Sequence, residues 1–438
     1  MEVMIPRILC ALFSAGLALA QSGPAPDPGA TARKALDLFL GQNYGEMRRL
    51  FSPEMAATPS VAEDKLKSLG SQIVAQGAAK VGDAAVHPAG SDRIVVIPVA
   101  FPKETITFRF TVDSAGLVSG FFMARTATTP AIPWERPAYS KPDAFRERDV
   151  TVGNDEWKLP GTLTVPAGSG RFPAVVLVAG SGPVDRDDSV GPNKVFRDLA
   201  EGLASRGIVV LRYEKRARQY QAKFAAMENM TALDETIDDA AAAAALLRTQ
   251  PEVDAKRIFV LGYGLAGNLA PRIADADGKL AGLVIFAGNA TPLEDAIVEQ
   301  SQYLGMAPGD LQLRRAEAAK VKSLTPGDED APPISVGSLT APPSFWLDLK
   351  RYDPAAAARK LTIPILILQG ERDYQVTMKD FGLWKSALGK SKNVTFKSYP
   401  ALNHLFTAGE GKSLPAEYAK PGHVAPEAID DIAKFMGK

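Results

Sequence analysis

The chain has 438 residues, which is more than one typical domain, and its 46% hydrophobic residues suffice for large cores. Its formal net charge is zero and its sequence pI is near 6.9. Electrostatics therefore favour neither a nucleic-acid backbone nor an anionic membrane as a partner. One local basic cluster is offset by Glu214, and we expect it to form a solvated loop: Arg212, Lys215, Arg216 and Arg218.

The first residues have the pattern of an export signal. Arg7 precedes the apolar run Ile8–Ala20, which ends in the cleavage pattern Ala18-Leu19-Ala20. The run is too short to span a bilayer comfortably, so we expect a signal peptide at residues 1–20, no stable membrane insertion after its removal, and an exported (periplasmic or secreted) mature protein. Cleavage would also remove Cys10, the single cysteine, which excludes disulfides and thiolate metal sites. We expect no metal and no cofactor.

Residues 31–125 have the pattern of a small α+β domain. Helical spacing of apolar residues comes first, and strand patterns follow at 94–101 and, with strict alternation, at 106–112. Helices followed by a curved antiparallel sheet resemble the cone-shaped domains of the nuclear-transport-factor type. His87, the one histidine in this region, is expected to be structural. The Pro-rich segment 126–147 is then expected to be a linker.

From residue 148 to the C terminus, strand and helix patterns alternate, which predicts right-handed crossovers and a mostly parallel sheet. The segments 150–152 and 161–165 come first and are expected to pair as an antiparallel hairpin. Residues 291–350 interrupt the alternation and are interpreted as a lid insertion. The later strand candidates are Ala174–Ala179, Ile208–Leu211, Ile258–Leu261, Leu283–Ala287, Ile363–Leu368 and Val394–Tyr399.

A glycine-rich turn follows one of these strands. Arg257–Leu261 leads into Gly262-Tyr263-Gly264-Leu265-Ala266-Gly267, and a helix pattern comes next. A strand–turn–helix with the pattern G-x-S-x-G carries a serine nucleophile at its third position. Here that position is Gly264, which has no side chain to attack an acyl group.

The other parts of an ester-hydrolysing site are represented. Asp373 directly follows an apolar strand and is the candidate acid, and His404 follows the next strand and is the candidate base. His423, beyond the last strand, is the weaker alternative for the base. The oxyanion donors are expected to be the backbone N–H groups of Leu265 and Ser181, the latter in the Gly-rich loop after Ala174–Ala179.

These motifs resemble a secreted, carboxylesterase-like branch of the α/β-hydrolases, near the dienelactone hydrolase and serine aminopeptidase groups. The resemblance covers residues 148–438 and is carried by the segments 180–187, 191–200, 210–216, 369–373 and 402–404. It implies an α/β-hydrolase fold with a lid, Asp373 and His404 as triad members, and a small acyl-ester-like ligand. The sequence departs from the family at Gly264, at Tyr263, where histidine is common, and at Ala266, where glycine is common. Three neighbouring departures favour natural divergence over a single engineered change.

Three hypotheses remain open. The chain is a pseudo-hydrolase that binds ligands in the old acyl pocket, or a hydrolase in which His404 activates water, or a conventional esterase whose nucleophile is replaced in this sequence. Loss of the serine favours the first hypothesis. Retention of Asp373 and His404 argues against a pure binder, because binding requires neither residue.

The export signal is directly testable. N-terminal sequencing of the protein recovered outside the cytoplasm is expected to begin at Gln21, because the apolar run ends in Ala-x-Ala. A mature chain that retains residues 8–20 would contradict the prediction.

Overall fold

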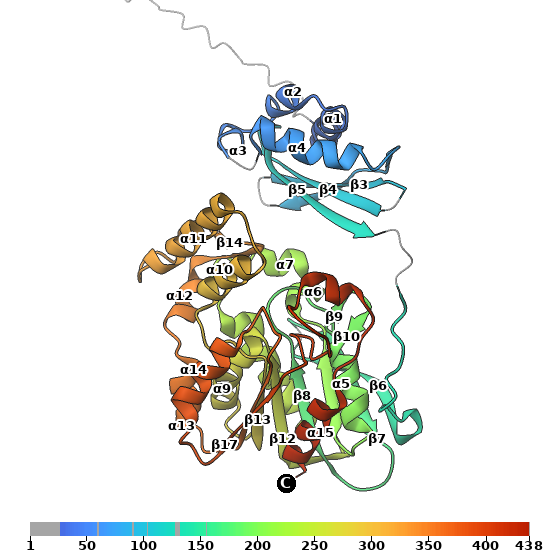
Figure 1. Cartoon of the computed structure of the whole chain (residues 1–438), viewed down its shortest axis with the longest axis vertical. Helices are drawn as coiled ribbons and strands as arrows, with labels where there is room; N and C mark the ends of the chain where they lie inside the picture. Colours follow the sequence, from blue (N-terminus) through green and yellow to red (C-terminus); the bar gives the residue numbers. More distant parts are fainter. Residues whose placement is uncertain are drawn as a thin grey trace, which may run out of the picture. The chain divides into compact units, whose positions relative to one another are not determined.

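The computed structural model describes residues 27–58, 61–89, 92–102, 104–127, 132–154 and 156–437. These form two compact units, one up to residue 130 and one from residue 131 onward. Each is coloured by its place in the sequence in Figure 1. The expected signal peptide at 1–20 lies outside the described residues. Within the described ranges, no helix is long and apolar enough to cross a membrane.

The first unit packs helices on an antiparallel sheet of order β1-β3-β4-β5, with β2 paired to β3. Alternate residues of β4, such as Phe108 and Phe110, are fully buried, as the period of two along a strand requires. Phe39 of α1 lies with its ring centroid 5.6 Å from that of Phe108. The elements are α1 (Pro28–Leu40), α2 (Tyr44–Arg48), α3 (Pro53–Ala56), α4 (Glu63–Val74), β1 (Lys80–Val81), β2 (Ala85–Ala89), β3 (Asp92–Ala100), β4 (Glu104–Val112) and β5 (Val118–Ala127).

The second unit is built on an eight-stranded sheet of order β17-β16-β13-β12-β8-β11-β7-β6. β7 pairs antiparallel with both β6 and β11, and the other neighbouring strands pair parallel. The predicted opening hairpin and mostly parallel sheet are therefore present. The strands are β6 (Phe145–Val152), β7 (Leu159–Pro166), β8 (Phe172–Val178), β11 (Val209–Tyr213), β12 (Val253–Tyr263), β13 (Gly282–Phe286), β16 (Ile365–Gly370) and β17 (Val394–Tyr399).

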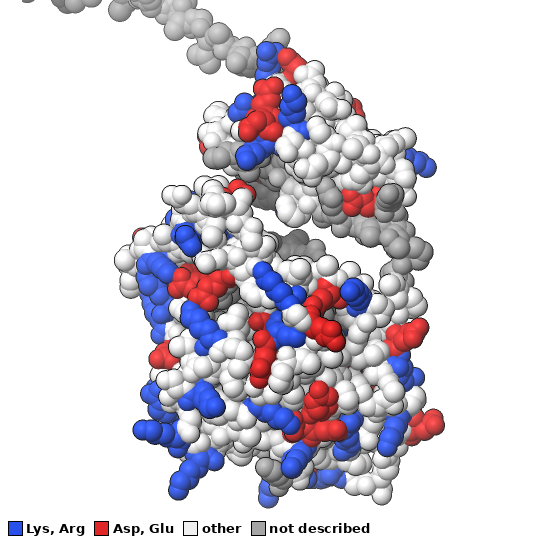
Figure 2. All heavy atoms as spheres, viewed as in Figure 1, with Lys and Arg blue, Asp and Glu red and all other residues white. Residues whose placement is uncertain are grey.

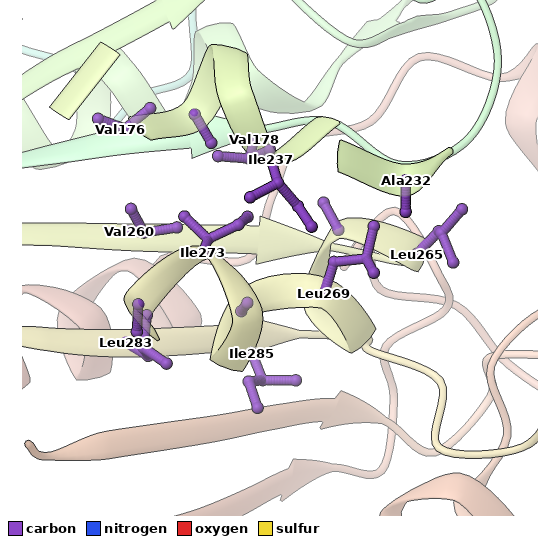
Figure 3. Close-up of a cluster of buried hydrophobic side chains, with 14 of the residues drawn as sticks. Val176, Val178, Ala232, Ile237, Val260, Leu265, Leu269, Ile273, Leu283 and Ile285 are labelled. Carbon is purple, nitrogen blue, oxygen red and sulfur yellow. The ribbon is translucent and has the colours of Figure 1, made fainter. Parts of the chain in front are cut away.

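Helices cover both faces of this sheet. β8 shows why both faces are apolar: Val176 and Val178 belong to one core, while Val175 and Leu177 belong to the other. α8 (Asp238–Arg248), α9 (Leu265–Asp277) and α14 (Met378–Leu388) cover the first face, and α5 (Val195–Ala204) and α15 (Pro426–Met436) cover the second. Figure 3 shows apolar side chains of α9 directed toward β12 and β13.

The segment expected as a linker is partly packed on the second unit. The Trp134 indole N–H donates to Asp198 at 2.9 Å, and Arg136 pairs with the buried Glu201 at 2.6 Å. A short 3₁₀ turn (Pro142–Ala144) then leads into β6, which begins at Phe145. The second unit therefore includes residues before 148, and its N-terminal segment is anchored by side-chain contacts with α5.

The insertion between β13 and β16 is mostly helical. It contains α10, α11 and α12, a two-stranded ribbon, and α13. Their bounds are α10 (Leu293–Tyr303), α11 (Pro308–Ser323), β14 (Ile334–Val336), β15 (Leu339–Ala341), α12 (Pro343–Lys350) and α13 (Pro354–Lys360). The remaining short elements are β9 (Ser189–Val190), β10 (Asn193–Lys194), α6 (Arg216–Gln219), α7 (Gln221–Ala225), a π-helical turn (Leu233–Ile237) and a 3₁₀ turn (Pro415–Ala419).

The expectation of a solvated basic loop at 212–218 is wrong. Arg212, Lys215 and Arg216 are each at most 4% exposed. Arg216 makes two hydrogen bonds to Asp239, at 2.8 and 2.5 Å. Charge runs usually face water, but here each buried cation has a carboxylate partner that lies elsewhere in the sequence. Only Arg218 has the expected exposure.

On the face drawn in Figure 2, exposed Lys and Arg are interspersed with Asp and Glu.

The Arg216–Asp239 pair yields a stability prediction. Arg216→Met is expected to lower the free energy of unfolding by about 3–5 kcal/mol, because it leaves the Asp239 carboxylate buried without its partner. Arg218→Met is the matched control in the same helix, and its exposed side chain predicts a change within about 0.5 kcal/mol. Denaturant unfolding measures both. Equal effects of the two substitutions would contradict the buried-pair interpretation.

Candidate active site

The turn after β12 has the geometry of a nucleophile elbow. Gly264 has φ 58° and ψ −121°, a conformation that strains a residue with a Cβ, and it immediately precedes helix α9. Gly262 is required sterically, because a Cβ there would lie 2.2 Å from the carbonyl oxygen of Ala266. At Gly264, by contrast, there is room. A Cβ built on it would have one described neighbour within 4 Å, His404 Nε2 at 3.9 Å.

Asp373 and His404 are brought together by the ends of β16 and β17. His404 Nδ1 lies 2.7 Å from Asp373 Oδ2, and the Asp373 side chain has no solvent exposure. With the carboxylate as acceptor, Nδ1 carries the proton, and in the neutral ring Nε2 faces position 264 as an acceptor. His423, the alternative base, is instead bonded to Asp198 at 3.2 Å, a contact that raises the pKa of His423.

Further contacts hold the Asp373 carboxylate in place. Its Oδ1 accepts the backbone N–H groups of Gln375 and Val376, at 2.8 and 3.0 Å. Its Oδ2 accepts the side-chain N–H of the buried Gln369 at 3.1 Å. With His404, these donors satisfy both carboxylate oxygens, so a fully buried charge is compensated and its orientation is fixed.

Tyr263 is a positioning residue for the imidazole. Its ring stacks on the His404 ring with a centroid separation of 4.8 Å and an interplanar angle of 27°. Its hydroxyl donates to the His404 backbone carbonyl at 3.1 Å. Burial raises the pKa of this phenol well above its usual value, so the hydroxyl stays protonated and can donate. The tyrosine in place of the usual histidine therefore holds the ring of His404, the candidate base, in position.

The loop after β8 lies directly against the elbow. A Cβ on Gly180 would be 3.1 Å from the Tyr263 carbonyl oxygen and 3.6 Å from the Leu265 backbone nitrogen. Leu265 is the first residue of α9, so its N–H has no acceptor within the helix and is available to an anion. Ser181 is exposed and lines the same cavity as Leu265. The two expected oxyanion donors are thus in one place.

Lys215 also holds this loop. Its Nζ donates to the Gly180 carbonyl oxygen at 2.6 Å and forms an ion pair with the buried Glu235. The loop backbone is therefore tied to an ammonium group that is itself 4% exposed. A rigid attachment of this kind is what oxyanion donors need if they are to be oriented before the reaction.

The elbow, the candidate base and the β8 loop border one cavity of about 480 Å³. Gly264, Leu265 and His404 line it together with Gly180 and Ser181 of the β8 loop. The insertion contributes apolar side chains from α10, including Leu293 and Ile297, so it covers part of the cavity. The volume suits a small or medium ligand. Among the described residues, no group of three or more His, Cys, Asp or Glu side chains is arranged to hold a metal ion.

Asp188 is a further member of the cavity wall. It is 4% exposed and has φ 49°, and its Oδ2 is buried with no hydrogen-bond partner in the described part of the chain. Burial raises the pKa of this carboxyl group to about 7, although His404 and Lys215 oppose the shift. Sequence reasoning missed Asp188, Lys215, Gln369 and the role of Tyr263. The segments 180–187, 210–216 and 369–373 and the departure at Tyr263 had drawn attention to these positions or their surroundings, but not to what the side chains contact.

Comparison with known proteins shows the family of this chain. The Dienelactone hydrolase family matches residues 159–323. Esterase EstD of Thermotoga maritima is 42% identical over 342 residues, which are 77% of this chain and 78% of that protein. This chain belongs to the esterase-like α/β-hydrolases near dienelactone hydrolase. The α/β-hydrolase fold predicted from the sequence is therefore confirmed.

Two solved structures are among those similar to this chain. Esterase Pf2001 of Pyrococcus furiosus is 17% identical with a TM-score of 0.43, and the match covers 70% of this chain and 96% of that one. Est1E of Butyrivibrio proteoclasticus is 14% identical with a TM-score of 0.45, and the match covers 66% and 99%.

The raised pKa of Asp188 predicts how stability depends on pH. The folded protein holds this proton more tightly than the unfolded chain, whose aspartate has an ordinary pKa of 3.8. The contribution of Asp188 to the free energy of unfolding therefore falls as pH rises from about 4 to about 7, by up to roughly 4 kcal/mol at 1.36 kcal/mol per pKa unit. Asp188→Asn removes this loss. We therefore expect the unfolding midpoint of Asp188→Asn minus that of the unsubstituted protein to be larger at pH 8 than at pH 4.5. If the unfolding midpoints of the two proteins change in parallel with pH, the assignment of a raised pKa to Asp188 is wrong.

Proposed function

We propose that this α/β-hydrolase binds acyl esters in the cavity at the elbow and hydrolyses them weakly, through water activated by His404, because no nucleophile stands at position 264. The observation that carries the proposal is the open space between Gly264 and His404. Nε2 lies 3.9 Å from where a Cβ on Gly264 would be, and apart from Gly264 and its two chain neighbours no other described residue has an atom within 4 Å of that point. A serine side chain would fill this space, and a water molecule can occupy the same position.

The proposed reaction follows from the contacts around the base. His404 Nε2 takes a proton from water while Nδ1 stays bonded to Asp373, and the resulting hydroxide attacks the ester carbonyl carbon. The backbone N–H groups of Leu265 and Ser181 stabilise the oxyanion of the tetrahedral intermediate. Return of the proton from Nε2 to the alkoxide releases the alcohol and leaves the carboxylic acid. No acyl-enzyme forms, and the base returns to its starting state.

The expected rate is low but measurable. An oxyanion hole and substrate binding leave about 10³–10⁴-fold acceleration over water when a triad member is missing. A water molecule is also less well positioned than a covalently attached hydroxyl, so it loses the advantage of an intramolecular reaction. We therefore expect His404-dependent hydrolysis far below that of an intact esterase.

The alternative function is non-catalytic binding of acyl-ester-like ligands. The missing side chain at Gly264 favours it, since a pocket without a nucleophile still has its apolar wall and backbone donors. The two functions differ in one measurable property. A weak hydrolase loses the His404-dependent part of its ester hydrolysis in His404→Ala, whereas a binder has the same background rate with and without this imidazole.

We also propose that the mature protein acts outside the cytoplasm. The proposal rests on the sequence pattern of residues 7–20, an arginine followed by an apolar run that ends in Ala-Leu-Ala.

Restoring the nucleophile is the main test of the proposed function. Gly264→Ser is expected to raise the hydrolysis rate of a short acyl ester at least about tenfold, which corresponds to some 1.4 kcal/mol in the barrier. The reason is that a serine Oγ, one bond from the Cβ position, can reach hydrogen-bonding distance of His404 Nε2. The same substitution is expected to lower stability by about 1–3 kcal/mol, because φ 58° and ψ −121° strain a residue with a Cβ.

Gly264→Ala is the matched control for this experiment. Alanine introduces the same backbone strain without a hydroxyl group, so it should lower stability similarly and leave hydrolysis unimproved. Adding His404→Ala to Gly264→Ser should abolish the gain. If Gly264→Ser folds and binds the ester but hydrolyses it no faster than Gly264→Ala, the assignment of position 264 and His404 to one catalytic centre is wrong.

A further inference from the structure

The cavity wall has an unusual charge balance. The described residues that line it include one carboxylate, Asp188, and no lysine or arginine. The rest of the wall is formed by the imidazole of His404, uncharged polar groups, and apolar side chains such as Leu293 and Ile297. A ligand in this cavity therefore meets a single acidic group set among mostly neutral surroundings.

No cation among the described residues forms an ion pair with this carboxyl group, although His404 and Lys215 attract it electrostatically. No salt bridge to Asp188 is present among the described residues, and its buried Oδ2 has no hydrogen-bond partner there. The nearby ammonium groups are engaged elsewhere: Lys215 with Glu235 and the Gly180 carbonyl, and Lys194 with Asp187 at 2.7 Å. A buried carboxyl group without a donor is costly, and one that a native structure keeps calls for a physical reason, such as a catalytic role or a bound partner.

The position of Asp188 is fixed by its own loop. Its backbone N–H donates to the Asp185 carbonyl oxygen at 3.0 Å, and the Asp185 side chain accepts the N–H of Ser189 at 3.0 Å. This is the same loop that carries Gly180 and Ser181 to the elbow. The carboxyl group is thus held in the wall of the cavity where the ester would bind, close enough to His404 for the two to interact electrostatically.

We propose that Asp188 binds an ammonium group of the ligand, so that the substrate class is an ester that carries a primary amine. The proposal rests on the proposed function, since it takes the cavity to be the ester site. A charged N–H donor gives the carboxylate the partner that the protein does not supply, and charge-assisted hydrogen bonds are roughly twice as strong as neutral ones. The positive charge of the ligand also opposes the effect of burial on Asp188, which otherwise favours the neutral form of this carboxyl group.

Calorimetric titration with two esters of the same shape tests the proposal. Ethyl 6-aminohexanoate carries a terminal ammonium group where ethyl heptanoate has a methyl group. The titrations use the His404→Ala protein, which keeps Asp188 and does not consume the esters through the base. We expect the amino ester to bind at least about tenfold more tightly than ethyl heptanoate.

Substitution of Asp188 identifies the source of the preference. In Asp188→Asn, on the same His404→Ala background, the two affinities are expected to agree within about twofold. Asp149→Asn is the matched control, because it removes a carboxylate that is 92% exposed and contacts Arg186 of the same loop at 3.5 Å. This control should keep the full preference. If Asp188→Asn does not fold, the smaller neutral variant Asp188→Ser takes its place.

The outcomes separate this inference from the proposed function. Equal binding of the two esters by the protein with Asp188 overturns the inference and leaves the ester site standing. A preference that persists in Asp188→Asn, or disappears in Asp149→Asn, overturns the assignment to Asp188. Failure of both esters to bind overturns the proposed ester site itself, and the inference with it.

Discussion

Parallel pairing of β8, β12, β16 and β17 within one sheet is the constraint on which the site depends. Because the carboxyl ends of parallel strands meet at one edge, four segments that are far apart in the sequence reach the same place. They bring the oxyanion loop, the elbow, Asp373 and His404. Helices bury both faces of this sheet in packed apolar cores, which hold its strands in place. The geometry of the proposed site therefore follows from the packing of the sheet.

At this site, Gly264 is a local departure from the family pattern, and the groups around it keep their contacts with one another. The elbow keeps its strained angles, and the acid and base keep their 2.7 Å contact. Tyr263 stacks on the imidazole, so this departure from the family pattern has a structural role of its own. Glycine avoids the backbone strain that a residue with a Cβ has at this position. A chain whose function no longer requires an acyl-enzyme can therefore gain stability by replacing the nucleophile with glycine.

The strands, the elbow and the candidates Asp373 and His404 could be predicted from the sequence because each is marked locally. An apolar run followed by a polar residue indicates a strand end, and a chain with three histidines offers few alternatives. The contributions of Lys215, Gln369 and Asp188 could not be predicted in this way. Each depends on burial, and Lys215 and Gln369 also depend on partners 35 and 4 residues away, and a polar residue in the sequence carries no mark of either. The mistaken interpretation of the basic cluster has the same cause, since its carboxylate partners were not visible locally.

The central claim is that the site lacks only its nucleophile, and covalent labelling tests it most directly. A fluorophosphonate reacts with a serine that an adjacent base activates. Labelled proteins would be digested and the modified peptide located by mass spectrometry, for the unsubstituted chain, Gly264→Ser, and Gly264→Ser with His404→Ala. The account predicts no adduct on the unsubstituted chain, a stoichiometric adduct at residue 264 in Gly264→Ser, and its loss when His404 is removed. An adduct on Ser181 or another serine of the unsubstituted chain, or none on folded Gly264→Ser, would contradict it.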